Sequence, residues 1–173
     1  MIDRYVFKVF AIGFKGSDLE CFLNQDLGCS LGDTAPLSIG VNFTAKRVIL
    51  NEEEAAKLQI WSMSHGPEFN ITFPAFILGS QALVLLFNVY DSDFITIAQN
   101  IIHNTRMFIP NIPIFLLGNK TDENFNNNNQ DIMNKFCRDN KCNYLNYISM
   151  KTGEDFKDFY NNLTSSLIRL ISQ

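Results

Sequence analysis

Residues 12–20, IGFKGSDLE, follow an apolar run and partly match a phosphate-binding loop. That motif reads G-x-x-x-x-G-K-[ST]: its backbone N–H groups and lysine neutralise phosphate charge, and its hydroxyl group binds Mg²⁺. Gly13 stands at the first glycine. The second glycine, the lysine and the hydroxyl residue are replaced by Asp18, Leu19 and Glu20. The loop therefore keeps its first glycine and loses the cationic chemistry of the motif.

Two carboxylates beside a phosphate group are electrostatically unfavourable. Two like charges ~4 Å apart repel by on the order of 4 kcal/mol at an effective dielectric constant of 20. Leu19 supplies no compensating charge, and Lys15 stands at a different place in the loop. An alternative is that Glu20 binds a metal ion, because carboxylates are Mg²⁺ ligands. Gly13 and Gly16 are candidate backbone contacts for a nucleotide. We nevertheless expect the loop not to hold a triphosphate in the usual manner, and we do not expect Mg²⁺ to bind.

The segments that must position this loop alternate between strand-like and helix-like patterns. Short apolar runs rich in β-branched and aromatic residues predict buried strands over 5–13, 84–90, 113–120 and 144–149. Apolar residues at helical spacing predict helices over 93–108, 129–139 and 155–171. The expected buried stripe of the first helix includes Phe94, Ile97, Ile101 and Met107 or Phe108, and that of the last one Phe156, Phe159, Leu163, Leu167 and Leu170.

Residues 41–63 differ from this pattern, because they predict two strands joined by the acidic turn Asn51–Glu54. Strand, helix, hairpin and repeated strand–helix units predict an α/β three-layer fold. Its sheet is expected to have about six strands, mostly parallel, with one antiparallel edge pair. Ligands of such sheets bind at the carboxyl ends of the strands, where the loop 12–20 is expected. The polar run 124–130, NFNNNNQ, is expected to be a mobile surface loop.

Composition excludes several classes of protein. The chain has 173 residues, 46% of them hydrophobic, which suits one domain spanning residues 1–173. A net charge of −4 and 14 scattered basic residues argue against nucleic acid or an anionic membrane as partner. No apolar run reaches the ~18 residues of a membrane span, and the N-terminus lacks a secretory signal pattern. The four cysteines lack zinc-site spacing and suit cytosolic thiols, so a cytoplasmic protein is expected.

Two further motifs follow the later predicted strands. IPIFLLGNKTD at 112–122 contains N-K-x-D, and YISMKTGEDF at 147–156 contains S-x-K-T-G. Three other stretches fit the same order and spacing: LSIGVNF at 37–43, LQIW at 58–61 and NVYDSDF at 88–94. Together these motifs resemble the Ras superfamily of small GTPases, and its Rab-like branch most, from about Tyr5 to Ile171. The resemblance implies the small G-protein form of the P-loop NTPase fold.

The resemblance implies a guanine-binding role for residues after two of the strands. Asp122 would accept both guanine N–H donors in a charge-assisted bidentate contact. Asn119 would meet the base edge, and the stem of Lys120 would pack on the purine plane. Ser149 and Lys151 would form the second loop beside the base. GDP or GTP is therefore a candidate ligand, and the alternative is that Asn119 and Asp122 only cap and turn the chain.

The family's hydrolytic groups have no counterpart in this sequence. The motif W-D-T-A-G-Q of the family reads here as WSMSHG, from Trp61 to Gly66. Ser62 replaces the Mg²⁺-side aspartate, His65 the glycine that senses the γ-phosphate, and Gly66 the glutamine that orients water. Ser38 replaces the first-switch threonine and keeps its hydroxyl. His65 is either a general base or an ordinary surface residue. We expect no measurable GTP turnover and no catalytic residue.

The resemblance also implies a protein partner, because the family recruits effectors through apolar side chains of its switch segments. Here Ile39 and Phe69 would form that surface, whereas Trp61 and Phe43 could equally face the core. The favoured hypothesis is a pseudo-GTPase that acts as an interaction module in signalling or trafficking. The alternative hypothesis is a guanine-nucleotide switch with weak binding and very slow hydrolysis.

Overall fold

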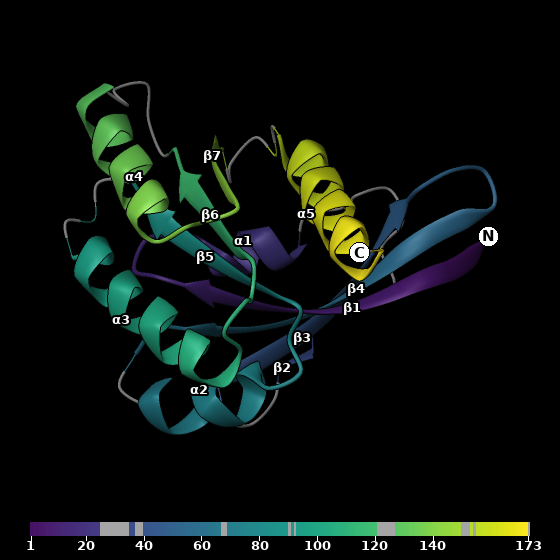
Figure 1. Cartoon of the computed structure of the whole chain (residues 1–173), viewed down its shortest axis with the longest axis horizontal. Helices are drawn as coiled ribbons and strands as arrows, with labels where there is room; N and C mark the ends of the chain where they lie inside the picture. The colour runs from purple at the N-terminus through teal and green to yellow at the C-terminus, as the bar shows by residue number, and fades with distance from the viewer. Residues whose placement is uncertain are drawn as a thin grey trace.

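The computed structural model describes residues 1–24, 35–36, 40–66, 69–89, 91, 93–120, 127–149, 153 and 155–172. Its strands are β1 (Ile2–Gly13), β2 (Ala35–Pro36), β3 (Val41–Ile49), β4 (Glu54–Ser64), β5 (Ala82–Asn88), β6 (Ile114–Asn119) and β7 (Tyr144–Ile148). Its helices are α1 (Leu19–Asn24), α2 (Phe69–Ile77), α3 (Phe94–Phe108), α4 (Asn127–Asp139) and α5 (Phe156–Ile171). From β4 onward, helices and strands alternate along the chain (Figure 1).

The described strands form one seven-stranded sheet in the order β2-β3-β4-β1-β5-β6-β7. The pairs from β4 to β7 are parallel, whereas β3 pairs antiparallel with both β2 and β4. This confirms the predicted α/β fold with a mostly parallel sheet and an antiparallel edge. The two-residue β2 is the addition that the sequence did not predict.

The predicted hairpin over 41–63 is present as β3 and β4. Its tight turn has a local cause in Asn51. The side-chain Oδ1 of Asn51 accepts hydrogen bonds from the backbone N–H groups of Glu53 and Glu54, each at 2.9 Å. Such an Asx turn reverses the chain without a glycine.

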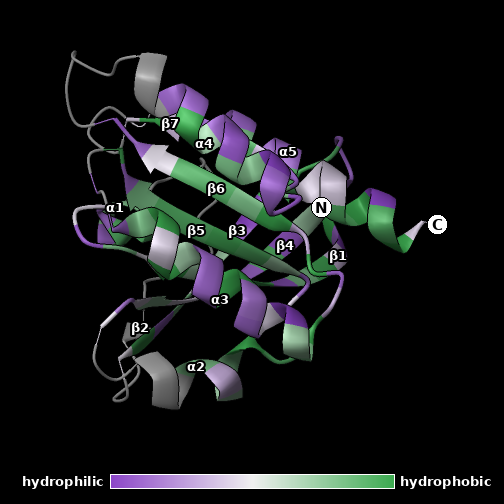
Figure 2. Ribbon diagram, turned by 60° about the vertical axis from the view of Figure 1, so that its left-hand side comes forward, coloured by the Kyte–Doolittle hydropathy of each residue, from purple (hydrophilic) through white to green (hydrophobic). Residues whose placement is uncertain are grey.

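Helices cover both faces of the sheet and bury two separate hydrophobic clusters (Figure 1). Side chains of α1 and α5 belong to one cluster, and side chains of α2, α3 and α4 belong to the other. The central strands β5 and β6 are buried at nearly every position and consist mostly of hydrophobic residues (Figure 2). Strands covered on both faces are expected to lack polar alternation, which explains this pattern.

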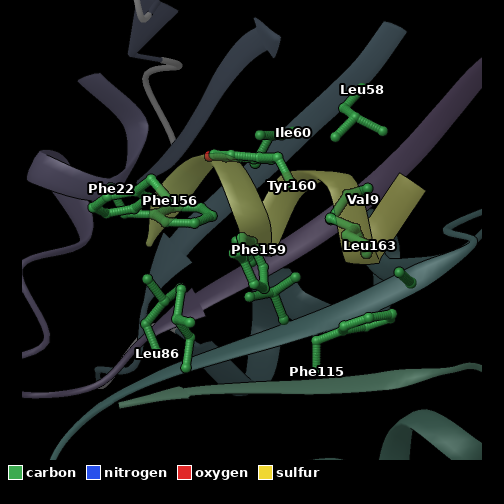
Figure 3. Packing of buried hydrophobic residues seen from close by; sticks show 14 of the residues in the cluster. Val9, Phe22, Leu58, Ile60, Leu86, Phe115, Phe156, Phe159, Tyr160 and Leu163 are labelled. Atoms are coloured by element: carbon green, nitrogen blue, oxygen red, sulfur yellow. The ribbon is translucent and has the colours of Figure 1, made fainter. Parts of the chain in front are cut away.

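Aromatic side chains hold α1 against α5 (Figure 3). The ring of Phe22 in α1 lies 5.7 Å from that of Tyr160 and 6.0 Å from those of Phe156 and Phe159 in α5. All four side chains are at most 2% exposed. Because α1 directly follows the loop after β1, this packing fixes one end of that loop.

The sequence predictions for the start of α4 and for the end of α3 need correction. Residues 127–130 of the expected mobile loop form the first turn of α4, and 124–126 lie outside the described residues. Met133 and Phe136 anchor α4 in the core, and its polar first turn continues that helix. At the end of α3, Met107 and Phe108 are exposed, and Thr105 takes the buried position.

Thr105 can be buried because its Oγ1 donates a 2.7 Å hydrogen bond to the carbonyl of Ile101 one turn earlier. The stripe of α5 is buried as predicted except for Leu170, which is 48% exposed in the last turn. Helix α2 was not predicted, since it contains Pro74 and shows no clear helical spacing.

Candidate functional site

The loop between β1 and α1 makes a tight turn that explains the glycine at position 16. The N–H of Ser17 donates to the carbonyl of Phe14 at 3.0 Å, and Gly16 has a φ of +71°. A Cβ atom added at Gly16 would lie 2.8 Å from Nδ2 of Asn88. Glycine is therefore required at position 16 by the backbone conformation and by the neighbouring side chain. Gly16 meets these demands whether or not the loop binds a phosphate.

Leu19, at the position of the phosphate-binding lysine, points into the core. Its side chain is 8% exposed and belongs to the cluster formed by α1, α5 and the sheet. A Cβ atom added at Gly13 would lie 2.6 Å from Cβ of Leu19, so the leucine packs directly over that glycine. Both ends of the partial motif thus serve hydrophobic packing.

Asp18, at the position of the second motif glycine, bonds across the edge of the sheet. Its φ is +55°, in the left-handed region, and its Oδ2 accepts a 2.8 Å hydrogen bond from Nδ2 of Asn119. Asn119 is the last residue of β6 and is 1% exposed. The structure therefore joins the loop after β1 to the N-K-x-D segment, 101 residues apart in sequence.

The residues predicted to surround a guanine base lie at this same edge. Asn119 is the last residue of β6, Lys120 follows it, and Ser149 follows β7. The N–H of Lys120 donates to the carbonyl of Ile148 at 2.8 Å, and the N–H of Gly153 donates to the carbonyl of Ser149 at 3.0 Å. The first bond holds the segment after β6 next to the end of β7, and the second is a local turn within the segment after β7. Asp122 and Lys151, the other predicted members of the set, lie outside the described residues.

His65, after β4, is tied to the loop after β1. Its N–H donates to the carbonyl of Gly13 at 2.8 Å, and its ring stacks on Phe14 at 5.6 Å with an 11° interplanar angle. Phe14 in turn packs edge-on against Phe94 at 4.8 Å. Partial burial lowers the pKa of His65 below its ordinary value, which favours the neutral imidazole. His65 is thus a packed residue, and no pattern in the sequence indicates its contact with Phe14.

Ser62, in the place of the Mg²⁺-side aspartate, is fully buried inside β4. Its hydroxyl has no hydrogen-bond partner among the described residues. The side chain has no carboxylate to offer a cation and no exposure to reach one. Ser38, in the place of the first-switch threonine, lies outside the described residues.

Three aromatic side chains form a row over the hairpin and α2. Trp61 lies 5.2 Å from Phe43 in a T-shaped contact and 5.8 Å from Phe76. Nζ of Lys8 lies 5.3 Å from the Trp61 ring, and it donates 2.7 Å hydrogen bonds to the carbonyls of Phe76 and Leu78.

Phe43 and Trp61 are half-buried, so they lie at the rim of the core and neither of the two expectations fits them fully. Burial lowers the pKa of Lys8 from its ordinary value. Lys8 and Phe76 were not found from the sequence, because Phe76 stands on the unpredicted α2. Ile39 and the side chain of Phe69 lie outside the described residues.

Comparison with known proteins decides the family. The model of the family described as "Ras family" matches residues 8–169. The chain belongs to the Ras family. The Ras-related protein Rab-1D of Dictyostelium discoideum is 31% identical over 119 residues, which are 68% of this chain and 58% of that protein. The match to Rab-1D thus spans less than two thirds of that relative.

Two other relatives match nearly the whole chain. A probable Rab-related GTPase of Acanthamoeba polyphaga mimivirus is 26% identical over 171 residues, covering 96% of this chain and 77% of that protein. The Ras-related protein Rab-4A of Danio rerio is 25% identical over 169 residues, covering 96% and 78%. The Rab-like assignment within the Ras superfamily is therefore confirmed.

Membership of the Ras family implies that the chain binds guanine nucleotide and Mg²⁺. The residues of the loop between β1 and α1, the phosphate side of the sheet edge, do not fit these ligands. Leu19 is buried where a lysine would be needed, and the carboxylate of Asp18 accepts a hydrogen bond from Asn119. Among the described residues, no three His, Cys, Asp or Glu side chains are grouped as metal ligands.

No described helix combines the length and apolarity that a membrane crossing needs.

The structure describes three of the four cysteines. Cys21, Cys137 and Cys142 form no disulfide, and Cys29 lies outside the described residues. Burial, with the nearby Cys137, raises the pKa of Cys142 to about 12. A thiol with such a pKa is unreactive at neutral pH.

Proposed function

We propose that this Ras-family chain is a cytoplasmic pseudo-GTPase, a single domain over residues 1–173 that binds a protein partner in signalling or trafficking without hydrolysing GTP. The observation that carries the proposal is the position of Leu19. At the place where the motif needs a lysine, this chain has a leucine that is 8% exposed and packed over Gly13.

The energetic case against triphosphate binding has two parts. Exposing Leu19 to open the loop would cost about 1.5–3 kcal/mol of hydrophobic stabilisation. The carboxylate of Asp18, in the same loop, would repel a phosphate by on the order of 4 kcal/mol at ~4 Å and an effective dielectric constant of 20. Neither cost is offset by a cation from the motif.

Hydrolysis is disfavoured by the groups after β4. Ser62 is buried without a carboxylate, and Gly66 carries no side chain to orient water. Positioned charge-stabilising groups each contribute roughly 10²–10³ to catalytic rates, and the nucleotide-hydrolysing members of this fold class depend on several at once. With these groups and the lysine replaced, we expect no turnover above background.

A protein partner is supported by the aromatic row of Phe43, Trp61 and Phe76. Half-buried aromatic side chains are enriched at protein interfaces, and here Lys8 fixes the end of α2 beside them. A surface that is already ordered costs less entropy on binding. The proposed contact surface combines this row with Ile39 and Phe69, as the sequence suggests.

The alternative function, a guanine-nucleotide switch with weak binding and slow hydrolysis, is favoured by one observation. Asn119, Lys120 and Ser149 are gathered at one edge of the sheet, where a base could contact them. A protein named as a probable Rab-related GTPase is among the relatives of this chain. The two functions differ in whether nucleotide stays bound through purification and whether it is turned over.

The experiment reads the nucleotide content of the purified protein by denaturing it and separating the supernatant by anion exchange. A multiple-turnover phosphate-release assay on the same preparation measures hydrolysis. The triple variant Asp18→Gly, Leu19→Lys, Glu20→Ser restores the three loop residues and serves as the matched control. We expect the wild-type protein to carry no GDP or GTP and to release no phosphate above buffer. Stoichiometric nucleotide, or turnover that survives repurification, would establish the switch instead.

A further inference from the structure

Asp18 and Asn119 connect the two halves of the edge at which the family's ligand would lie. Oδ2 of Asp18 accepts the 2.8 Å hydrogen bond from Nδ2 of Asn119. Asn119 is fixed in the sheet, since it pairs in register with Asn88 of β5 and Ile148 of β7. Asp18 is exposed and belongs to the loop, so the loop is the part that this bond immobilises.

The backbone at Asp18 is strained in a way that needs compensation. Its φ of +55° lies in the left-handed region, which non-glycine residues rarely adopt without a stabilising interaction. The carbonyl of Asp18 accepts the first helical bond of α1, from the N–H of Phe22 at 3.1 Å. An aspartate at that position usually caps its own helix with its side chain. Here the side chain of Asp18 accepts its hydrogen bond from Asn119.

The buried amide of Asn119 makes this bond more than a surface contact. Asn119 is 1% exposed, and buried polar groups are costly unless they are hydrogen-bonded. A carboxylate acceptor gives a stronger hydrogen bond than a neutral one. Asp18 therefore places a negative charge beside the β1–α1 turn and satisfies a buried donor of the N-K-x-D segment.

We propose, building on the pseudo-GTPase proposal above, that Asp18 replaces the nucleotide as the anion that organises this site. Its carboxylate ties the loop after β1 to the end of β6, orders both without a ligand, and closes the phosphate side to anions. Asp18 is thus a positioning residue that sets the specificity of the edge against nucleoside phosphates.

The test measures the melting temperature of nucleotide-free protein for the wild type, Asp18→Gly and Asp18→Asn. Glycine removes the carboxylate and also relieves the left-handed strain, so backbone conformation alone would raise the melting temperature. Asparagine tolerates the same φ and keeps an uncharged acceptor. We expect Asp18→Gly to melt about 3–8 °C below the wild type and Asp18→Asn to melt between the two.

Hydrogen exchange and a second substitution localise the effect. In Asp18→Gly, the amides of Ser17 and Phe22 are expected to exchange at least tenfold faster than in the wild type. In a background of Asn119→Ala, Asp18→Gly is expected to change the melting temperature by less than half as much. Should Asn119→Ala fail to fold, the exchange measurement on Asp18→Gly still decides.

An Asp18→Gly protein that melts at or above the wild-type temperature, with unchanged exchange at Ser17 and Phe22, would overturn the inference. That result leaves the absence of GTP turnover untouched, so the pseudo-GTPase proposal would survive it. Conversely, bound nucleotide in the wild-type protein would remove the pseudo-GTPase proposal and this inference together.

Discussion

The base side of the sheet edge, at the ends of β6 and β7, differs from the phosphate side, the loop between β1 and α1, in how many residues of the Ras-like motifs it keeps. On the base side, Asn119, Lys120 and Ser149 keep the residue types that the Ras-like motifs require, at the ends of β6 and β7. On the phosphate side, Leu19 and Phe14 are buried hydrophobic residues. The same sheet edge thus carries polar residues of the Ras-like motifs at one end and buried hydrophobic residues at the other. The loop after β1 thus needs Gly13 and Gly16 for packing and backbone conformation, although the lysine and hydroxyl of the phosphate-binding motif are absent from it.

Restoring the phosphate-side residues should change nucleotide affinity more than any other substitution proposed for the two sides. The triple variant Asp18→Gly, Leu19→Lys, Glu20→Ser removes two negative charges and adds one positive charge. We expect it to bind GDP at least 100-fold more tightly than the wild type, because each removed repulsion and each added attraction amounts to about 1–4 kcal/mol near a surface. Titration calorimetry with GDP and Mg²⁺ measures the change. Equal affinities would show that the phosphate side does not limit binding.

The two sides should also differ in their contribution to stability. Leu19→Ala removes a buried side chain and should lower the free energy of unfolding by about 2–4 kcal/mol. Lys120→Ala, on the base side, should change it by less than about 0.5 kcal/mol. Urea denaturation measures both, and Leu19→Met is the volume-conserving control, with an expected loss below about 1.5 kcal/mol. Similar losses for Leu19→Ala and Lys120→Ala would contradict the distinction between the two sides.

The aromatic row gives a smaller effect, which concerns how firmly the partner surface is held. Lys8→Met keeps most of the aliphatic stem and removes the ammonium group from the carbonyls of Phe76 and Leu78. We expect a loss of about 1–2 kcal/mol in unfolding free energy, from two charge-assisted bonds and the contact with Trp61. Faster hydrogen exchange in α2 than in α3 would locate the loss. Uniform exchange across both helices would show that Lys8 does not specifically hold α2.

The smallest effect is a pH dependence at His65. Because burial lowers the pKa of His65 in the folded state, the unfolded chain binds the proton more readily. The stability is therefore complete above the unfolded value of about 6.5, and it falls as the pH drops through the lower folded pKa. Melting temperatures of the wild type and His65→Phe between pH 7.5 and pH 5 measure this. We expect the wild type to lose slightly more stability on acidification than the variant does. Identical slopes would contradict the packed, neutral state of His65.

Much of the fold could be predicted because hydrophobic patterns dominate it. The continuous apolar runs of β5 and β6 and the helical spacing in α3 and α5 each specify an element. Helix α2 could not be predicted, since Pro74 and a sequence with no clear helical spacing obscure a helix that tertiary contacts hold. The sequence predicts a loop where the first turn of α4 lies, because its asparagines carry no hydrophobic signal, whereas Met133 and Phe136 further along secure the helix.

The candidate site was less predictable than the fold. Sequence comparison with the phosphate-loop motif identified Asp18 and Leu19 as departures, but it could not reveal where their side chains go. The bond from Asn119 to Asp18 joins segments 101 residues apart, and no periodicity or propensity reports on such a pair. The stacking of His65 on Phe14 likewise depends on the tertiary arrangement of two loops.

We propose that the phosphate side of this edge does not attract phosphate. The most direct test compares the affinities of the wild-type protein for guanosine and for GDP by titration calorimetry under identical conditions with Mg²⁺. With the carboxylate of Asp18 bonded to Asn119 and Leu19 buried, the phosphates should add nothing, and GDP should bind no more tightly than guanosine. GDP binding tenfold or more tighter than guanosine, a gain of about 1.4 kcal/mol or more, would contradict the claim.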